Sequence, residues 1–256
     1  MAEKVNWEKI GRTAVITFKQ VTVDPEFIED FCSVMDEIEN QKNIRVVVIA
    51  GAKGKIFFSG YDIGLVSKNL EISYQKGSTL EVQRLMNRVE HCVLPVIGIV
   101  DGYAVGGGCE LLLACDLVYA SERAVMGTPE VRIGLIPAAG GTIRLPKQVG
   151  KHRAMEMILT GKLYSAKQAS EMGIVNEVFH HDELWDEALK IANIIADNAP
   201  IAVKAGKYNV VSALTLLDKQ MELITVDACI ECLRSEDIKE GAAAFVEKRK
   251  PHFTGK

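Results

Sequence analysis

Residues 95–115 read PVIGIVDGYAVGGGCELLLAC, and this stretch predicts the fold class. The apolar run over residues 95–100 predicts a strand that is covered on both faces, as parallel strands are. Three glycines at residues 106–108 then lead into a short helix over residues 109–115. The first N–H groups of such a helix have no acceptor inside it and lie at the positive end of its dipole. They predict either an oxyanion site or a sharp strand-to-helix turn without chemistry.

The flanking sequence repeats this alternation of strands and helices on both sides. Strands are predicted at residues 5–9, 13–18, 46–51, 95–100, 117–120 and 175–178, and helices at residues 27–38, 79–92, 184–198, 201–217, 218–233 and 238–248. Strands that alternate with helices in this way predict an α/β fold with parallel strands. The last third is mostly helical and carries wide apolar faces, which is typical of helices that pack on another subunit.

Two glutamates occupy segments that favour chemistry. Glu110 falls in the first turn of the short helix, where the dipole favours a carboxylate whatever its function. Glu130 lies in a stretch interrupted by glycines and prolines, which predicts a loop until a helix begins near residue 142. A single acid among apolar loop residues suits a catalytic carboxylate, and the alternative is an ion pair with Arg132 or Arg144. Spacing alone does not decide between these interpretations.

A second turn follows the strand that ends at Phe57 and Phe58. Residues 59–60 turn the chain, and a helix is expected to begin over residues 61–63. Such a turn is able to point a backbone N–H into a pocket, although the motif is weak by itself.

Bulk composition limits the class of protein. The 256 residues fit one large domain, or one domain with a small appendage. No apolar run approaches the ~18 residues of a membrane span, and a net charge of −4 without a long basic run argues against nucleic acid as a partner. Most of the six cysteines fall in apolar patterns, as reduced core thiols do. The start of the sequence lacks the pattern of a signal or transit segment, so a cytoplasmic location is predicted.

Three motifs occur together, in this order, in one family. They are G-x-A-x-G-G-G-C-E-L-x-x-A-C-D at residues 102–116, P-E-x-x-x-G-x-x-P-x-x-G-G-T-x-R-L at residues 129–145, and A-F-x-E-K-R-x-P-x-F at residues 244–253. The chain therefore resembles the crotonase (enoyl-CoA hydratase/isomerase) superfamily over essentially its whole length. The resemblance implies a crotonase-type spiral of ββα units over residues 1–195 that carries the acyl-CoA site. It implies a C-terminal helical region over residues 196–256 that drives trimerisation, commonly as a dimer of trimers.

The resemblance also implies a function, that of an enoyl-CoA hydratase acting reversibly on a 2-enoyl-CoA. Glu110 and Glu130 would flank one water, and the backbone N–H groups of Tyr61 and Gly107 would form an oxyanion hole. The residues it implies for substrate binding are Ser59, Gly60, Asp62, Ile63, Gly106, Pro129 and Lys248. It implies no metal and no cofactor, since coenzyme A is part of the substrate, and neither nucleic acid nor membrane as a partner.

One position of the second motif is left out of the substrate site. The chain has no glycine equivalent at position 138, where Ala138 stands. No substrate-binding role is therefore predicted for residue 138.

Two departures from the family pattern keep other functions open. Tyr61 stands where members of the family usually carry a small residue, and its larger side chain is expected to reshape the acyl pocket. Residues 21–27 lack the R-P-x-x-x-N-A-L/M segment that helps to hold coenzyme A. The alternatives are a crotonase-fold isomerase, decarboxylase or hydrolase, with a branched or cyclic acyl group, and a non-catalytic acyl-CoA-binding subunit.

Overall fold

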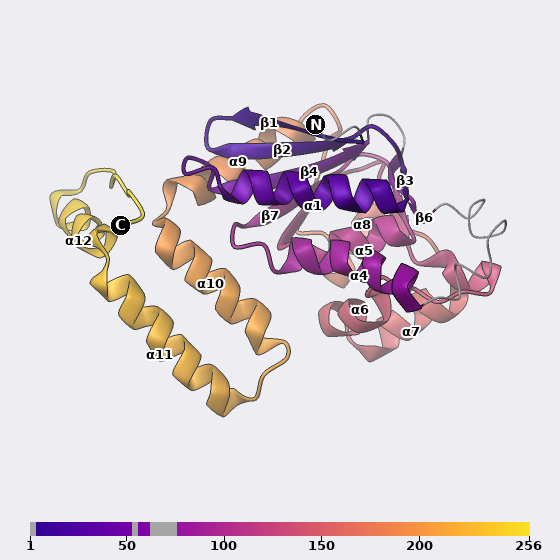
Figure 1. Cartoon of the computed structure of the whole chain (residues 1–256). Coiled ribbons are helices and arrows are strands. Elements are labelled where there is room, and N and C mark those ends of the chain that lie inside the picture. The colour runs from indigo at the N-terminus through magenta and orange to yellow at the C-terminus, as the bar shows by residue number, and fades with distance from the viewer. Residues whose placement is uncertain (1–3, 53–55, 62–75) are drawn as a thin grey trace.

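A six-stranded sheet forms the centre of the chain in the computed structural model (Figure 1). The structure describes residues 4–52, 56–61 and 76–256. The first two strands of this sheet form an antiparallel hairpin, and each later strand pairs parallel to its neighbour. In spatial order the strands are β1 (Val5–Ile10), β2 (Thr13–Phe18), β4 (Val46–Ala52), β7 (Val96–Val100), β9 (Leu117–Ser121) and β12 (Glu177–Phe179).

Two smaller sheets lie beside the large one. The four-stranded sheet has the order β11 (Tyr164–Ser165), β10 (Val125–Gly127), β8 (Tyr103–Val105) and β5 (Ile56–Phe58), and a two-stranded sheet pairs β3 (Thr22–Val23) with β6 (Gly60–Tyr61). Three times the chain passes from the large sheet to the four-stranded sheet and then to a helix. These passages are β4–β5–α4 (Lys76–Glu90), β7–β8–α5 (Gly107–Ala114) and β9–β10–α6 (Gly141–Val149). The α/β class and the spiral of ββα units are thereby confirmed.

Strand β4 shows why its apolar run is continuous. Val47 and Ile49 enter the main hydrophobic core, whereas Val46 and Val48 enter a second core on the other face of the sheet. Helices α1 (Pro25–Glu39) and α4 cover the first face, and α9 (Leu184–Asp197) covers the second with alanines spaced four residues apart. The strand is buried on both faces, as predicted.

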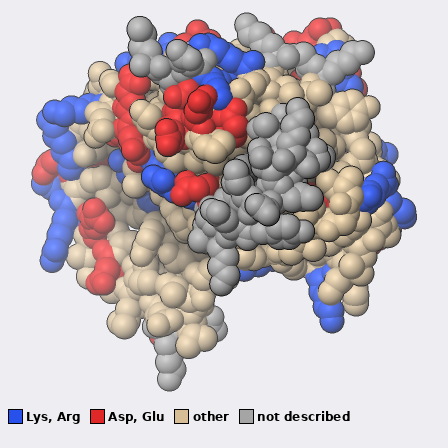
Figure 2. Space-filling view, turned by 45° about the vertical axis from the view of Figure 1, so that its right-hand side comes forward, with Lys and Arg blue, Asp and Glu red and all other residues tan. Residues whose placement is uncertain are grey.

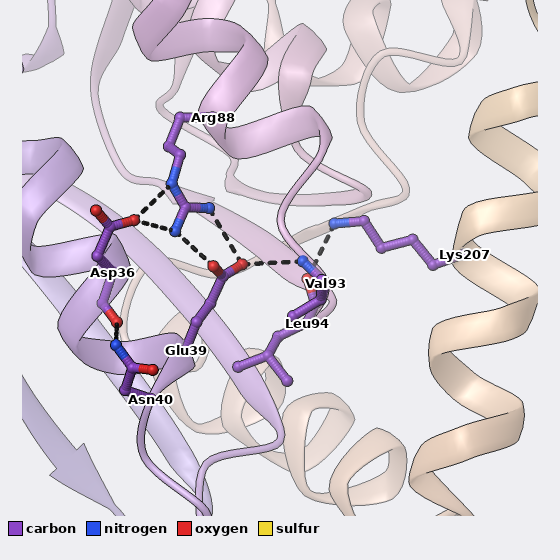
Figure 3. A network of polar contacts seen from close by, with 7 residues as sticks. All are labelled: Asp36, Glu39, Asn40, Arg88, Val93, Leu94 and Lys207. Carbon is purple, nitrogen blue, oxygen red and sulfur yellow. Dashed lines mark hydrogen bonds and ion pairs between the residues drawn. The ribbon is translucent and has the colours of Figure 1, made fainter.

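A polar network joins α1, α4 and the turn before β7 (Figure 3). Arg88 of α4 forms ion pairs with Asp36 at 2.8 Å and with Glu39 at 2.5 Å, and both carboxylates belong to α1. Glu39 also accepts a hydrogen bond from the backbone N–H of Val93 at 3.0 Å. The network holds α4 against α1, and α4 also contacts α5, the helix that carries part of the candidate site described below.

The C-terminal helices project from the sheets as an arm (Figure 1). This C-terminal arm consists of α10 (Pro200–Ala213), α11 (Asp218–Arg234) and α12 (Glu236–Glu247), whereas α7 (Lys151–Thr160) and α8 (Ala166–Met172) belong to the body. The chain leaves the sheet layers after α9, close to the predicted division between residues 195 and 196, which stays a prediction. Within the described ranges, none of the helices combines the length and apolar character that crossing a membrane requires.

One lysine ties the arm to the body. Lys207 of α10 is almost fully buried, and it forms an ion pair with Asp116 at 2.7 Å. Its Nζ also donates a hydrogen bond to the carbonyl oxygen of Leu94 at 2.9 Å, as Figure 3 shows. Asp116 in turn accepts from the backbone N–H of Val96 at 2.7 Å. Asp116, directly before β9, therefore forms both an ion pair and a backbone hydrogen bond at a strand start.

Candidate active site

The glycine-rich entry to α5 is pressed against the segment that follows β5. A Cβ on Gly107 would lie 2.6 Å from the Cα of Gly60, and a Cβ on Gly108 would lie 1.8 Å from the carbonyl oxygen of Phe58. Only glycine permits this approach, because side chains at these positions would overlap the neighbouring backbone. The two backbone segments predicted to carry Tyr61 and Gly107 as hydrogen-bond donors therefore lie side by side.

Tyr61 belongs to a strand rather than to the helix start expected from the sequence. Gly60 and Tyr61 pair with Thr22 and Val23 in a short parallel ladder. The expectation was wrong because the ladder partner lies nearly forty residues earlier in the chain, beyond the reach of local patterns. Ser59 anchors the same turn, since its backbone N–H and its hydroxyl both donate to the carbonyl oxygen of Val21, at 2.8 and 2.9 Å.

Glu110 is a buried acid on α5 with one fixed partner. The residue is 3% exposed, and its Oε1 accepts a hydrogen bond from the backbone N–H of Gly141 at 2.7 Å. Gly141 is the first residue of α6, so the positive end of a second helix faces this carboxylate. Burial raises the pKa of Glu110 to about 7, the hydrogen bond from Gly141 opposes the rise, and the charge of Glu130 adds to it.

Glu130 lies in a 3-10 helix, η1 (Pro129–Ile133), and not in the irregular loop expected. Pro129 starts this helix because its fixed φ suits the first helical position. The carboxylate of Glu130 reaches the glycine-rich entry of α5, where its Oε1 lies 3.2 Å from the point that a Cβ on Gly106 would occupy. Burial raises the pKa of Glu130, as it does that of Glu110. Both acids thus border the N-terminus of α5.

The ion pair considered as the alternative role for Glu130 is absent. Among the residues that the structure describes, no lysine or arginine lies within ion-pair distance of Glu130, and its Oε2 is buried without a hydrogen-bond partner. Arg144 instead contacts Glu90 at 2.6 Å and Asn87 at 2.7 Å, both on α4. A buried carboxylate oxygen without a partner is rare in folded proteins and indicates a place for a polar ligand or a water.

The sequence did not predict the roles that two residues have in shaping this site. Gly141 supplies the hydrogen bond to Glu110, and Arg144 ties the start of α6 to α4. The pair of glycines at residues 140–141 is the only local signal, since the partners of both residues lie more than thirty positions away in the sequence.

Residue 138 contributes a backbone hydrogen bond to the structure and has no predicted role in substrate binding. It is Ala138, in the turn between η1 and α6, and the chain has no glycine equivalent at this position. The carbonyl oxygen of Ala138 accepts a hydrogen bond from Nε2 of Gln83 on α4 at 2.7 Å. Residue 138 therefore holds the turn before α6 against α4, a contact that the sequence did not predict.

The other residues predicted to bind substrate fall into three groups: those near the two acids, those outside the described residues, and Lys248 on the arm. Ser59, Gly60, Gly106 and Pro129 lie on the segments just described, and Asp62 and Ile63 lie outside the described residues. Lys248 caps α12 in a left-handed conformation at the far end of the arm, well apart from α5 and α6 (Figure 1). Within one chain, Lys248 is therefore not brought together with Glu110 and Glu130.

Comparison with known proteins identifies the family. The model of the enoyl-CoA hydratase/isomerase family matches residues 10–256. The chain belongs to this family. It is 36% identical to the short-chain-enoyl-CoA hydratase of Clostridium acetobutylicum, over 95% of this chain and 94% of the relative. It is 37% identical to the 2,3-dehydroadipyl-CoA hydratase of Escherichia coli, over 84% of this chain and 82% of the relative.

Solved structures of the enoyl-CoA hydratase/isomerase family share the whole architecture. A crystal structure of an enoyl-CoA hydratase from Bacillus anthracis superimposes with a TM-score of 0.93 at 32% identity, over 99% of this chain and 100% of that chain. The match includes the C-terminal arm as well as the sheets. The resemblance suggested by the three sequence motifs is confirmed, and two of those motifs carry the two acids of the site.

Proposed function

We propose that this chain is an enoyl-CoA hydratase, which adds water reversibly to a 2-enoyl-CoA and yields a 3-hydroxyacyl-CoA. The observation that carries the proposal is the pair of acids at the glycine-rich entry of α5, the buried Glu110 and the half-buried Glu130. The names of the relatives support the same reaction class, hydro-lyase chemistry on a coenzyme A thioester.

The oxyanion hole is assigned to the backbone N–H groups of Tyr61 and Gly107. Gly107 is the first residue of α5, so its N–H has no acceptor inside the helix. Addition at C3 moves negative charge onto the thioester oxygen, and a fixed donor at such an oxygen is worth about 3 kcal/mol. Close packing of Gly60 on Gly107 supports this assignment, because it brings both donor segments to one place.

The two acids divide the proton transfers between them. One carboxylate takes a proton from the water as the water oxygen bonds to C3, and the other acid delivers its proton to C2. Burial raises the pKa of both acids, and that of Glu110 reaches about 7, so Glu110 is able to hold or to release a proton near neutral pH. The chain itself supplies acid, base and oxyanion donors, so the proposed chemistry requires no metal or redox group.

Mutation of each acid tests the proposal. Glu110→Gln and Glu130→Gln are each expected to reduce crotonyl-CoA hydration by at least about 100-fold, the usual contribution of a positioned acid or base. Binding of 3-hydroxybutyryl-CoA, measured by calorimetry, should persist in both variants. Glu171→Gln removes an exposed glutamate from α8 and is the matched control. Near-native turnover in either active-site variant would exclude that residue from the mechanism.

The substrate panel separates hydration from the alternatives. Hydration removes the absorbance of the conjugated thioester, isomerisation of a 3-enoyl-CoA creates it, and a binding subunit does neither. Branched and cyclic enoyl-CoAs belong in the panel because Tyr61 replaces the usual small residue of the family.

The C-terminal arm is proposed to form the contact of a homotrimer or homohexamer. It exposes large apolar side chains, among them Leu217 at 74%, Leu223 at 70% and Val210 at 67%. In Figure 2 the arm is the lower-left lobe, and its visible surface is largely uncharged. Exposed apolar area of this extent is typical of subunit contacts. In such an assembly Lys248 would reach coenzyme A bound to a neighbouring subunit.

Sedimentation velocity tests the assembly. Leu223→Arg places a charge within the apolar surface of the arm and is expected to lower the mass of the particle. Glu171→Arg introduces the same side chain on the body and should leave that mass unchanged. A monomeric wild-type protein would contradict the proposal. The predicted cytoplasmic location is kept as a further proposal, supported by six free thiols, and cell fractionation tests it.

A further inference from the structure

Two parallel strands, β9 and the edge strand β12, end side by side in the large sheet. In β9 and β12, Ser121 pairs with Phe179, and the next residues are Glu122 and His180. The backbone N–H of Glu122 donates to the carbonyl oxygen of Phe179 at 3.0 Å, which fixes the register beyond the strands. The sheet thus places a carboxylate beside the two consecutive histidines, His180 and His181.

The side chains of these three residues converge. Oε1 of Glu122 lies 2.9 Å from Nδ1 of His181 and 3.8 Å from Nε2 of His180. One donor atom of each residue lies within 4.8 Å of those of the other two. Tetrahedral zinc, about 2.1 Å from each ligand, needs donor separations of about 3.4 Å. Small side-chain rotations are therefore enough to place one ion between the three donors.

A second carboxylate lies behind both imidazole rings. Oδ1 of Asp182 is 3.3 Å from Nε2 of His181, and Oδ2 is 3.6 Å from Nδ1 of His180. These are the ring nitrogens that do not face Glu122. Histidines that bind metal commonly direct the other ring N–H to a carboxylate, which orients the ring and raises its basicity. Asp182 has the position of such a partner for both rings at once.

Charge also favours a cation at this edge. Glu122 and Asp182 each contribute a carboxylate on opposite sides of the two imidazole rings. The nearby guanidinium of Arg123 is already paired with Asp101. All three ligand side chains remain open to solvent, so a fourth coordination position is accessible to water.

We propose that Glu122, His180 and His181 bind one divalent transition-metal ion of the zinc, cobalt or nickel class, with Asp182 orienting the two imidazoles. Two imidazoles and one carboxylate suit these ions and not magnesium or calcium, which prefer oxygen ligands. A bound ion would fasten the turn between β12 and α9 to the end of β9. The proposal does not depend on the proposed hydratase activity.

Calorimetric titration of the full-length protein with ZnCl₂ at pH 7.5 tests the site. One ion per chain is expected. His181→Ala and His180→Ala should each weaken binding at least about 30-fold, and Asp182→Asn about 10-fold, as for other partners of metal-binding histidines. His152→Ala removes an exposed histidine from α7 and should leave the affinity unchanged.

Cysteines require a separate control, because thiolates also bind zinc. Cys229 is exposed on α11, and Cys232 is one helical turn away. The Cys229→Ser/Cys232→Ser variant is expected to bind one zinc ion with unchanged affinity. In the same variant, cobalt(II) should give the visible absorption of a tetrahedral site, and His181→Ala should abolish it. Binding that is lost with the cysteines, or that survives loss of both histidines, would overturn the proposal.

Discussion

Replacement of Glu110 by glutamine is expected to stabilise the protein at alkaline pH while it removes activity. Glu110 is 3% exposed, and the pKa of its carboxyl group in the folded protein is about 7, against an ordinary value of 4.5. Between these two pH values the folded protein keeps a proton that the unfolded chain releases. The stability contributed by this group is therefore fully present below pH 4.5 and is lost as the pH rises through 7.

The size of the effect follows from the shift. A change in pKa from 4.5 to about 7 corresponds to about 3 to 4 kcal/mol, at about 1.4 kcal/mol per unit. Glutamine has nearly the shape of a protonated glutamate, and its oxygen can still accept the N–H of Gly141. The free energy of unfolding of Glu110→Gln, relative to wild type, should rise by about 2 to 3 kcal/mol between pH 5 and pH 8.

Urea unfolding followed by circular dichroism measures this difference at each pH. The protein concentration must be held constant, because assembly through the arm would add to the apparent stability. Glu171→Gln removes an exposed carboxylate, and its difference from wild type is expected to change by less than about 0.5 kcal/mol over the same range. A Glu110→Gln difference that does not vary with pH would refute the reasoning from burial.

Three further substitutions probe the packing around the site. Gly108→Ala places a Cβ 1.8 Å from the carbonyl oxygen of Phe58, so a loss of at least about 4 kcal/mol or a failure to fold is expected in circular dichroism. Lys207→Met removes the ion-pair partner of the partly exposed Asp116 and should lower the free energy of unfolding by about 1 to 2 kcal/mol in urea titrations; no change would show that the pair does not anchor the arm. Arg144→Met leaves Glu90 without its partner and releases the start of α6, so both stability and turnover are expected to fall, whereas native turnover would exclude a role in positioning the site.

The large sheet was predictable because its strands carry their own signal. Residues 46–49 are apolar on both faces, and the structure covers both faces with helices. The small sheets carry no such signal. β8 and β10 have three residues each and β6 has two, and their pairing partners lie elsewhere in the chain. Short strands of this kind are determined by the partner ladder and not by local propensity.

The candidate site was only partly predictable from its own residues. The position of Glu110 in the first turn of a helix followed from the glycines before it, but its burial and its hydrogen bond with Gly141 did not. The choice between a catalytic and an ion-paired Glu130 depended on where Arg144 lies, and that is set by its contacts with α4. The resemblance to a family linked the two acids, whereas spacing alone left the alternatives open.

The order of the site along the chain has a consequence for biosynthesis. Gly60, Gly107, Glu110, Glu130 and Gly141 all precede α9, whose alanines cover the second face of the large sheet. A nascent polypeptide that has emerged from the ribosome only as far as residue 180 therefore carries each of these groups, while that sheet face has no cover. Premature termination at this point would yield a product that aggregates through the bare sheet, and synthesis of α9 is the step that protects it.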